Sequence, residues 1–127
     1  MLPMDELQIE RTHGSSAGVT ILSLTGPLTM STLFDFQTAA RQPDVKDTIV
    51  DFSNVPYIDS AGLGVVLSHW AHTQRVGAKF AAVAISERVR VLLEMTRVST
   101  LLPMYATVAE AEQAFSSVTN SSSTASV

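Results

Sequence analysis

The sequence contains no cysteine, and this absence excludes several kinds of chemistry. Without cysteine the 127 residues can form no disulfide bond, no thiolate metal site and no cysteine nucleophile. Charged residues are also scarce, at 16% of the chain against about 25% in an average soluble domain, while apolar residues reach 46%. This composition predicts a globular core, and the length is that of one domain.

Basic residues are too few and too scattered to form a nucleic-acid-binding surface. Eight Lys and Arg stand against twelve Asp and Glu, which gives a net charge of −4, and no segment gathers the basic residues. The N-terminus lacks the basic flank and apolar segment of a signal peptide, and no apolar run approaches the roughly 20 residues of a membrane span. We therefore expect a cytoplasmic protein without direct nucleic-acid binding and without membrane insertion.

The order of apolar patterns along the chain predicts an α/β domain. Alternating or short β-branched apolar segments predict five strands, over 7–13, 19–25, 48–52, 79–85 and, more weakly, 101–105. Helical spacing predicts helices over 31–41 and 60–76, a third after the capping residue Ser86, and a short fourth after a capping box of Thr107 and Glu110. The first two strands should form a hairpin and the rest should be joined by crossovers. We expect a mixed, mostly parallel sheet of about five strands with four helices packed against it.

The same patterns predict which side chains are buried. In the first helix the apolar positions are Leu33, Phe34, Phe36 and Ala40. In the longest helix the stripe comprises Leu63, Val66, Leu67, Trp70 and Ala71, which leaves His69 and His72 on the polar side. Phe80 and Met95 are also expected in the core. Residues 116–127 are mostly Ser and Thr and cannot bury enough to order themselves, so we expect a domain over 1–115 and a disordered tail over 116–127.

The segment 55–67, Val-Pro-Tyr-Ile-Asp-Ser-Ala-Gly-Leu-Gly-Val-Val-Leu, joins a central strand to the longest helix. Open α/β sheets place their sites in such loops. Ser60 stands at the expected N-cap, where its hydroxyl would accept from the amide of Gly62 or Leu63. A phosphate there would meet free amides at the positive end of the helix. On the local pattern alone, a plain helix-capping serine without a further function is the simpler explanation.

The neighbours of Ser60 carry expectations of their own. Gly62 and Gly64 are expected to keep the first helical turn clear of side chains, so that another protein can approach the backbone. Asp59 is expected to repel a phosphate on Ser60 and to hold the helix entrance open to a kinase.

The run 51–64, Asp-Phe-Ser-Asn-Val-Pro-Tyr-Ile-Asp-Ser-Ala-Gly-Leu-Gly, resembles the signature loop of STAS domains, the family of bacterial anti-sigma factor antagonists. The segments Gly77-Ala78-Lys79 and 85–89 are also similar, so the resemblance covers about residues 7–115. In the family, the serine that follows the aspartate of the loop is phosphorylated by a partner that is both anti-sigma factor and serine kinase. That position here is Ser60.

The resemblance implies a partner-switching cycle. The unphosphorylated protein would bind the anti-sigma factor and thereby release a sigma factor, the phosphorylated protein would dissociate, and a serine phosphatase would reset it. The implied partner-binding loop is Asp59, Ser60, Ala61, Gly62 and Leu63. The resemblance implies a regulatory phosphoprotein and not an enzyme, without a metal or cofactor of its own, because ATP is bound by the kinase.

Two positions depart from the family pattern. Many antagonists carry two acids in a Gly-Glu-Leu-Asp stretch after the second strand, whereas this chain reads Gly26-Pro27-Leu28-Thr29. Arg97-Val98 replaces the Gly-Leu that follows the third helix, a change expected to alter the turn.

Other readings of the sequence remain open. One alternative is a STAS subunit that serves a membrane transport or lipid-trafficking assembly structurally, with Ser60 only a helix cap, and the missing acids are its main support. A hydrolase based on Ser60 is weakly supported, because Ile58 stands where a nucleophile elbow has glycine. His69 and His72 have a spacing that suits zinc, but the sequence offers no evident third ligand.

Overall fold

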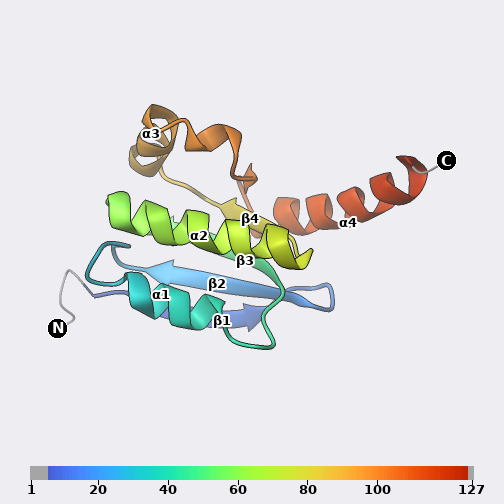
Figure 1. Ribbon diagram of the computed structural model, residues 1–127, viewed down its shortest axis with the longest axis horizontal. Helices are drawn as coiled ribbons and strands as arrows, with labels where there is room; N and C mark the ends of the chain where they lie inside the picture. Colours follow the sequence, from blue (N-terminus) through green and yellow to red (C-terminus); the bar gives the residue numbers. More distant parts are fainter. Residues whose placement is uncertain (1–5, 126–127) are drawn as a thin grey trace.

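Five strands form one sheet in the order β1-β2-β3-β4-β5 (Figure 1). The computed structural model describes the backbone of residues 6–125 and the side chains of residues 6–116. The strands are β1 (Gln8–His13), β2 (Val19–Thr25), β3 (Asp47–Asn54), β4 (Phe80–Val83) and β5 (Met104–Tyr105). β1 and β2 pair antiparallel, and every later pair is parallel. The expected mixed, mostly parallel sheet is confirmed.

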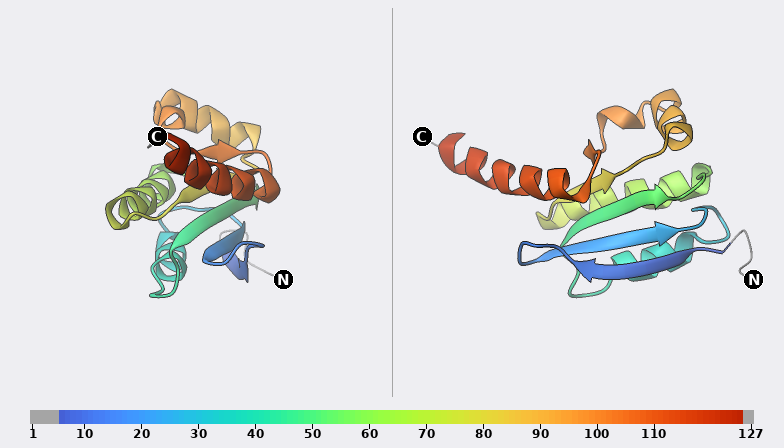
Figure 2. Two further views of the ribbon diagram at one scale, coloured as in Figure 1. Left: turned by 90° about the vertical axis from the view of Figure 1, so that its right-hand side faces the viewer. Right: turned by 180° about the vertical axis from the view of Figure 1, so that it is seen from behind.

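Helices cover both faces of this sheet (Figure 2). They are α1 (Leu33–Ala40), α2 (Ser60–Val76), α3 (Glu87–Met95) and α4 (Val108–Ala125), with a short 3-10 turn η1 (Val98–Thr100). α1, α2 and α3 pack on one face, in a core that includes Phe36, Val66 and Leu93. α4 packs on the other face through Ala111 and Phe115.

The predicted helix 60–76 is confirmed residue for residue, but its buried face is only partly the predicted one: Leu63 and Val66 are buried as expected. Its buried residues are Gly62, Leu63, Val65, Val66, His69 and Thr73, whereas Leu67, Trp70 and Ala71 are only half-buried. His69 is 3% exposed instead of solvated. Its Nε2 lies 3.1 Å from the Thr48 hydroxyl, a hydrogen bond that offsets part of the cost of burying the ring.

Two apolar side chains expected in the core are exposed. Phe34 is 70% exposed, because Phe36 takes the inward position and residues two apart on a helix cannot share a face. Met95 is 76% exposed, because it lies off the stripe of Val89 and Leu93 at the end of α3. Phe80, at 3%, is in the core as predicted.

The capping predictions for the last two helices hold in most respects. The Ser86 hydroxyl accepts from the Val89 amide, and the Thr107 hydroxyl accepts from the Glu110 amide. The Glu110 carboxylate reaches the amide of Ala106 in place of that of Thr107. α4 is not short, because its backbone continues to Ala125, through most of the segment expected to be a tail. The side chains of that segment lie outside the described residues, so a disordered tail stays a prediction.

The turn after α3 is formed by a residue that does not favour it. Arg97 has φ 61° and ψ 18°, the left-handed conformation that costs a non-glycine residue about 1–2 kcal/mol. Arg97 thus takes a backbone shape that glycine would take more readily.

We therefore expect Arg97→Gly to raise the free energy of unfolding by about 0.5–1 kcal/mol, since relief of the left-handed strain outweighs the greater chain entropy of glycine. Urea denaturation measures the change. Arg97→Ala is the matched control, because it removes the side chain but keeps the Cβ. A glycine variant no more stable than the alanine variant would contradict the explanation.

His69 should make the fold sensitive to acid. Burial, followed by the charges of Arg41 and His72, lowers the pKa of His69 from its ordinary 6.5 to about 4. Below pH 6.5 the unfolded chain binds a proton at this residue that the folded chain does not yet bind. The free energy of unfolding should therefore have its full value above pH 6.5. It should fall by about 3 kcal/mol in total as the pH drops towards 4.

Urea denaturation between pH 4 and 7.5 tests this expectation. His69→Gln should flatten the profile in that window, and His13→Gln, at the exposed end of β1, should keep the wild-type slope. Equal slopes for all three proteins would show that other groups cause the acid sensitivity.

Candidate functional site

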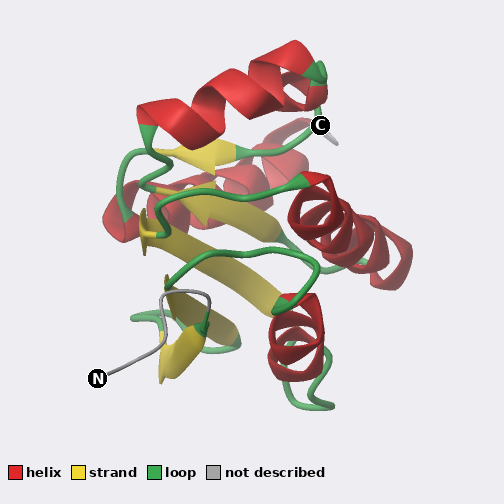
Figure 3. Ribbon diagram, turned by 90° about the vertical axis from the view of Figure 1, so that its left-hand side faces the viewer, coloured by secondary structure: helices red, strands yellow, loops and turns green. Residues whose placement is uncertain are grey.

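The loop that follows β3 meets the loop that follows β2 at the carboxyl end of the parallel strands. Figure 3 views this end, where α1 and α2 both begin. The amide of Leu28 donates to the Tyr57 carbonyl at 3.2 Å, and the amide of Asp59 donates to the Leu28 carbonyl at 3.3 Å. A further bond runs from the Gly26 amide to the Asn54 carbonyl at 3.0 Å. The two loops therefore form one backbone-bonded unit.

Asp59 joins the two loops through its side chain as well. One carboxylate oxygen accepts from the Gly62 amide at 2.8 Å, and the other accepts from the Met30 amide at 3.1 Å. These amides, that of Gly62 foremost, lower the pKa of Asp59. The Asp59 carboxylate thus ties the helix entrance to the preceding loop, and its expected part in keeping the entrance open to a kinase stays a prediction.

Asp59 is also the N-cap of α2, so the expectation that Ser60 caps the helix is wrong. Asp59 has extended backbone, φ −106° and ψ −176°, and its side chain accepts the capping bond, while Ser60 is the first helical residue. Ser60 is exposed, and no hydrogen bond joins its hydroxyl to any residue within 6–116. The hydroxyl therefore stands free at the positive end of a 17-residue helix.

Gly62 serves the packing of the two loops. A Cβ on Gly62 would lie 2.0 Å from the carbonyl oxygen of Leu28, so only glycine allows this approach. The expectation that Gly62 leaves room for another protein is therefore wrong. Around Gly64 there is open space, as expected.

The structure brings the five predicted loop residues together but gives them different surroundings. Ser60 is exposed, Asp59 and Ala61 are half-buried, and Gly62 and Leu63 are buried. Leu63 belongs to the core between the sheet and α2. Of the five, Ser60 is thus the residue that a partner can reach most readily.

The positions of the two missing acids are part of a tight turn. Pro27 is fully buried, and its carbonyl accepts from the Thr32 hydroxyl at 2.9 Å. The same hydroxyl accepts from the Thr29 amide at 2.9 Å. Hydrogen bonds within the turn thus fix its shape, and neither position 27 nor position 29 presents a charge.

The exposed apolar side chains around this loop were not predicted by any sequence motif. Met30 is 72% exposed and Tyr57 is 38% exposed, and the Arg88 guanidinium lies over the Tyr57 ring at 5.6 Å. One signal could have found part of this surface: Phe34 and Phe36 cannot both face the sheet, so one of them had to be exposed.

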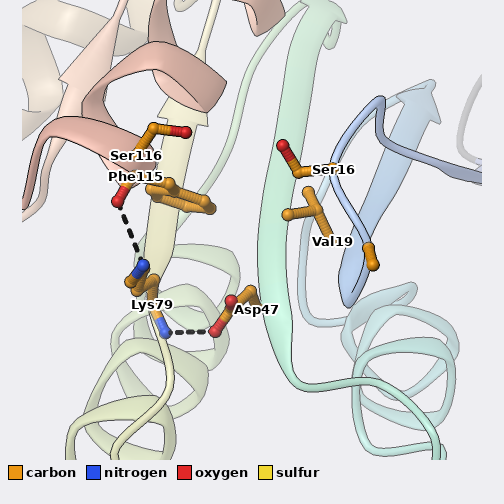
Figure 4. A pocket seen from close by; sticks show the side chains of 7 residues that line it. Ser16, Val19, Asp47, Lys79, Phe115 and Ser116 are labelled. Atoms are coloured by element: carbon orange, nitrogen blue, oxygen red, sulfur yellow. Dashed lines mark hydrogen bonds between the residues drawn. The ribbon is translucent and has the colours of Figure 1, made fainter. Parts of the chain in front are cut away.

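A hollow lies at the end of the sheet opposite to Ser60, where β2, β3 and β4 begin (Figure 4). It measures about 280 Å³ and is lined by Ser16, Ala17, Val19, Asp47, Lys79, Phe115 and Ser116. The Lys79 ammonium donates to the Phe115 carbonyl at 3.0 Å, and the Lys79 amide donates to the Asp47 carboxylate at 2.9 Å. These groups bind one another, and we assign the hollow no ligand.

His69 and His72 do not stand together on a solvated helix face. Their rings are stacked with centroids 6.1 Å apart, and His69 is enclosed in the core. Among the described residues, no three His, Asp or Glu side chains gather in a way that could hold a metal ion. No helix in the described part of the chain combines the length and apolar character needed to cross a membrane.

Comparisons with known proteins match most of the chain. The family model described as STAS domain matches residues 10–111. The anti-sigma F factor antagonist of Paenibacillus polymyxa is 28% identical over 103 residues, which cover 78% of this chain and 86% of that protein.

Solved structures share the fold at lower identity. A candidate anti-sigma factor antagonist of Thermotoga maritima is 23% identical with a TM-score of 0.75, over 83% of this chain and 92% of that chain. A sulfate transporter family protein of Wolinella succinogenes is 18% identical with a TM-score of 0.67, over 76% of this chain and 83% of that chain.

The capping arrangement predicts different costs for two adjacent alanine substitutions. Asp59→Ala removes the acceptor of two backbone amides and should lower the free energy of unfolding by about 1–2 kcal/mol. Ser60→Ala removes an exposed, unbonded hydroxyl and should change it by less than about 0.5 kcal/mol. Chemical denaturation of both variants measures the difference. A serine variant as destabilised as the aspartate variant would mean that Ser60 takes part in the cap.

Proposed function

The chain belongs to the STAS domain family, and from this premise we propose that it is an anti-sigma factor antagonist controlled by phosphorylation of Ser60. The unphosphorylated protein binds an anti-sigma factor that has serine kinase activity, and this frees a sigma factor for transcription. Phosphorylation of Ser60 ends the binding, and a serine phosphatase restores it. The observation that carries the proposal is the free hydroxyl of Ser60 directly after the capping Asp59.

One relative supports the general part of this proposal, which is that the protein antagonises an anti-sigma factor. The Paenibacillus polymyxa relative, which this chain matches over most of its length, is named an antagonist of an anti-sigma factor. The solved structures are less than 25% identical and support the fold alone.

The surroundings of Ser60 suit a phosphorylation switch. Both carboxylate oxygens of Asp59 accept from backbone amides, so the nearest negative charge is partly offset. A phosphate would add about −1.5 to −2 charges at pH 7. Because the Ser60 hydroxyl holds no structural hydrogen bond among the described residues, its phosphorylation breaks none. The modification would thus change the charge of the surface and leave the fold in place.

In this proposal the protein is regulatory and catalyses no reaction itself. A serine-directed fluorophosphonate probe, which labels serine hydrolases, should therefore not label Ser60, because no described side chain is hydrogen-bonded to its hydroxyl and His69 is enclosed in the core. The transport-subunit hypothesis is not favoured, because the Paenibacillus polymyxa relative that matches most of this chain is named an antagonist of an anti-sigma factor.

Binding to purified anti-sigma factor kinases of the source genome tests the proposal. One of them should bind the wild-type chain, transfer phosphate from ATP to Ser60, and then release it. Ser60→Ala should bind and stay bound in ATP, because it cannot be phosphorylated. Ser60→Asp should bind at least about tenfold more weakly, because it places a charge in the interface.

Ser16→Asp is the matched control, because Ser16 is an exposed serine in the loop before β2, at the opposite end of the sheet. It should bind as the wild type does. Mass spectrometry identifies the phosphorylated residue, and thermal melts verify that the variants are folded. Equal affinity for the wild type and Ser60→Asp would refute the switch.

A further inference from the structure

Large apolar side chains gather at the end of the molecule that carries Ser60. Among the described residues, seven such side chains are exposed. Five of them, Met30, Phe34, Tyr57, Val91 and Met95, belong to α1, to α3 and to the loops beside Ser60. Monomeric proteins seldom expose apolar side chains in groups, so this distribution indicates a surface that another molecule covers.

The first group, which we call the α1 lobe, consists of Met30 and Phe34. These side chains are 72% and 70% exposed. The lobe is fixed to the phosphorylation loop, because the Met30 amide donates to the carboxylate of Asp59, the residue before Ser60. The turn that leads into the lobe is held by the Thr32 hydroxyl. Its side chains are therefore presented on a constrained backbone, which lowers the entropy cost of binding.

The second group lies on the other flank and forms the α3 groove. This surface groove measures about 260 Å³ and is lined by Tyr57, Ile58, Arg88, Val89, Val91, Leu92 and Met95. Tyr57 and Ile58 belong to the same loop as Ser60. Arg88, the one charged lining residue, packs its guanidinium on the Tyr57 ring. The groove thus offers apolar walls and a single positive charge.

We propose that the α1 lobe and the α3 groove together form the docking surface for the anti-sigma factor, on either side of Ser60. The inference rests on the proposed function. A kinase that receives Ser60 in its active site must cover the surface next to Ser60, and both groups adjoin that residue through Asp59 and Tyr57. The partner contacts this surface with apolar side chains and places a carboxylate opposite Arg88. This carboxylate compensates the charge of the guanidinium, which loses its water when the partner covers it.

The charges around the Ser60 loop favour a partner surface that is apolar over one that is basic. Pro27 is buried and Thr29 is neutral, so the turn presents no carboxylate to a basic residue of the partner. The carboxylate of Asp59 is already engaged by two amides. Binding should consequently depend on apolar burial, and its affinity should respond little to salt.

The test uses the full chain and the anti-sigma factor kinase that phosphorylates Ser60. Phe34→Ser and Met95→Ser should each raise the Kd by about tenfold or more, as truncation of a central interface residue does. Val76→Ser is the matched control, because Val76 is 60% exposed at the far end of α2, and it should stay within about twofold of wild type. The wild-type Kd should change less than about threefold between 50 and 500 mM NaCl. Since the substituted side chains are largely exposed, all three variants should melt as the wild type does.

The outcomes separate this inference from the proposed function. A kinase that binds and phosphorylates the wild type but binds both variants equally well would overturn the docking surface and leave the function standing. If the Kd depends steeply on salt and the variants bind with wild-type affinity, docking depends on charges, and the proposed docking surface is overturned as well. A chain that dimerises, and whose dimer Phe34→Ser dissociates, would assign the surface to a second copy. If no kinase of the source genome binds the wild type, the proposed function fails and this inference fails with it.

Discussion

The carboxylate of Asp59 is the contact on which the arrangement of the site depends. It caps α2 through the Gly62 amide and holds the preceding loop through the Met30 amide. Two segments that are 29 positions apart in sequence are thereby joined at one residue. The close approach of Gly62 to the Leu28 carbonyl completes the junction and leaves no room for a Cβ. Ser60 follows directly and needs no bond of its own, which keeps its hydroxyl free.

The fold followed from the sequence where local patterns sufficed. The helix 60–76 was predicted to the residue, because apolar residues recur at helical spacing along it and Gly77, with φ 73°, ends it. Its buried face was misjudged because periodicity treats histidine as polar. The hydrogen bond of His69 to Thr48, on a strand 21 positions earlier, is a tertiary contact that no local pattern contains. Phe34 and Met95 were misplaced for a related reason: apolar character alone does not decide which of two competing residues faces the sheet.

The candidate site was predictable in identity and much less in geometry. The family motif led to Ser60, but it did not distinguish the capping residue from its neighbour, because aspartate and serine are both good N-caps. The motif also did not predict that Gly62 is needed for packing, because this follows only from the position of Leu28 in the folded chain. The apolar surface around the loop combines residues from three separate segments, and only the folded chain brings them together.

The direction of α4 determines how the molecule can be tethered. This helix begins after β5 and extends away from the end where α1 and α2 start (Figure 1). Near its start, Glu112 accepts from both the amide and the hydroxyl of Ser15, which fastens the helix to the hairpin loop on that far side. A fluorophore, affinity tag or surface linker fused beyond α4 would therefore stand clear of Ser60. Such a fusion allows the protein to be immobilised in a defined orientation, with its phosphorylation end facing the solution.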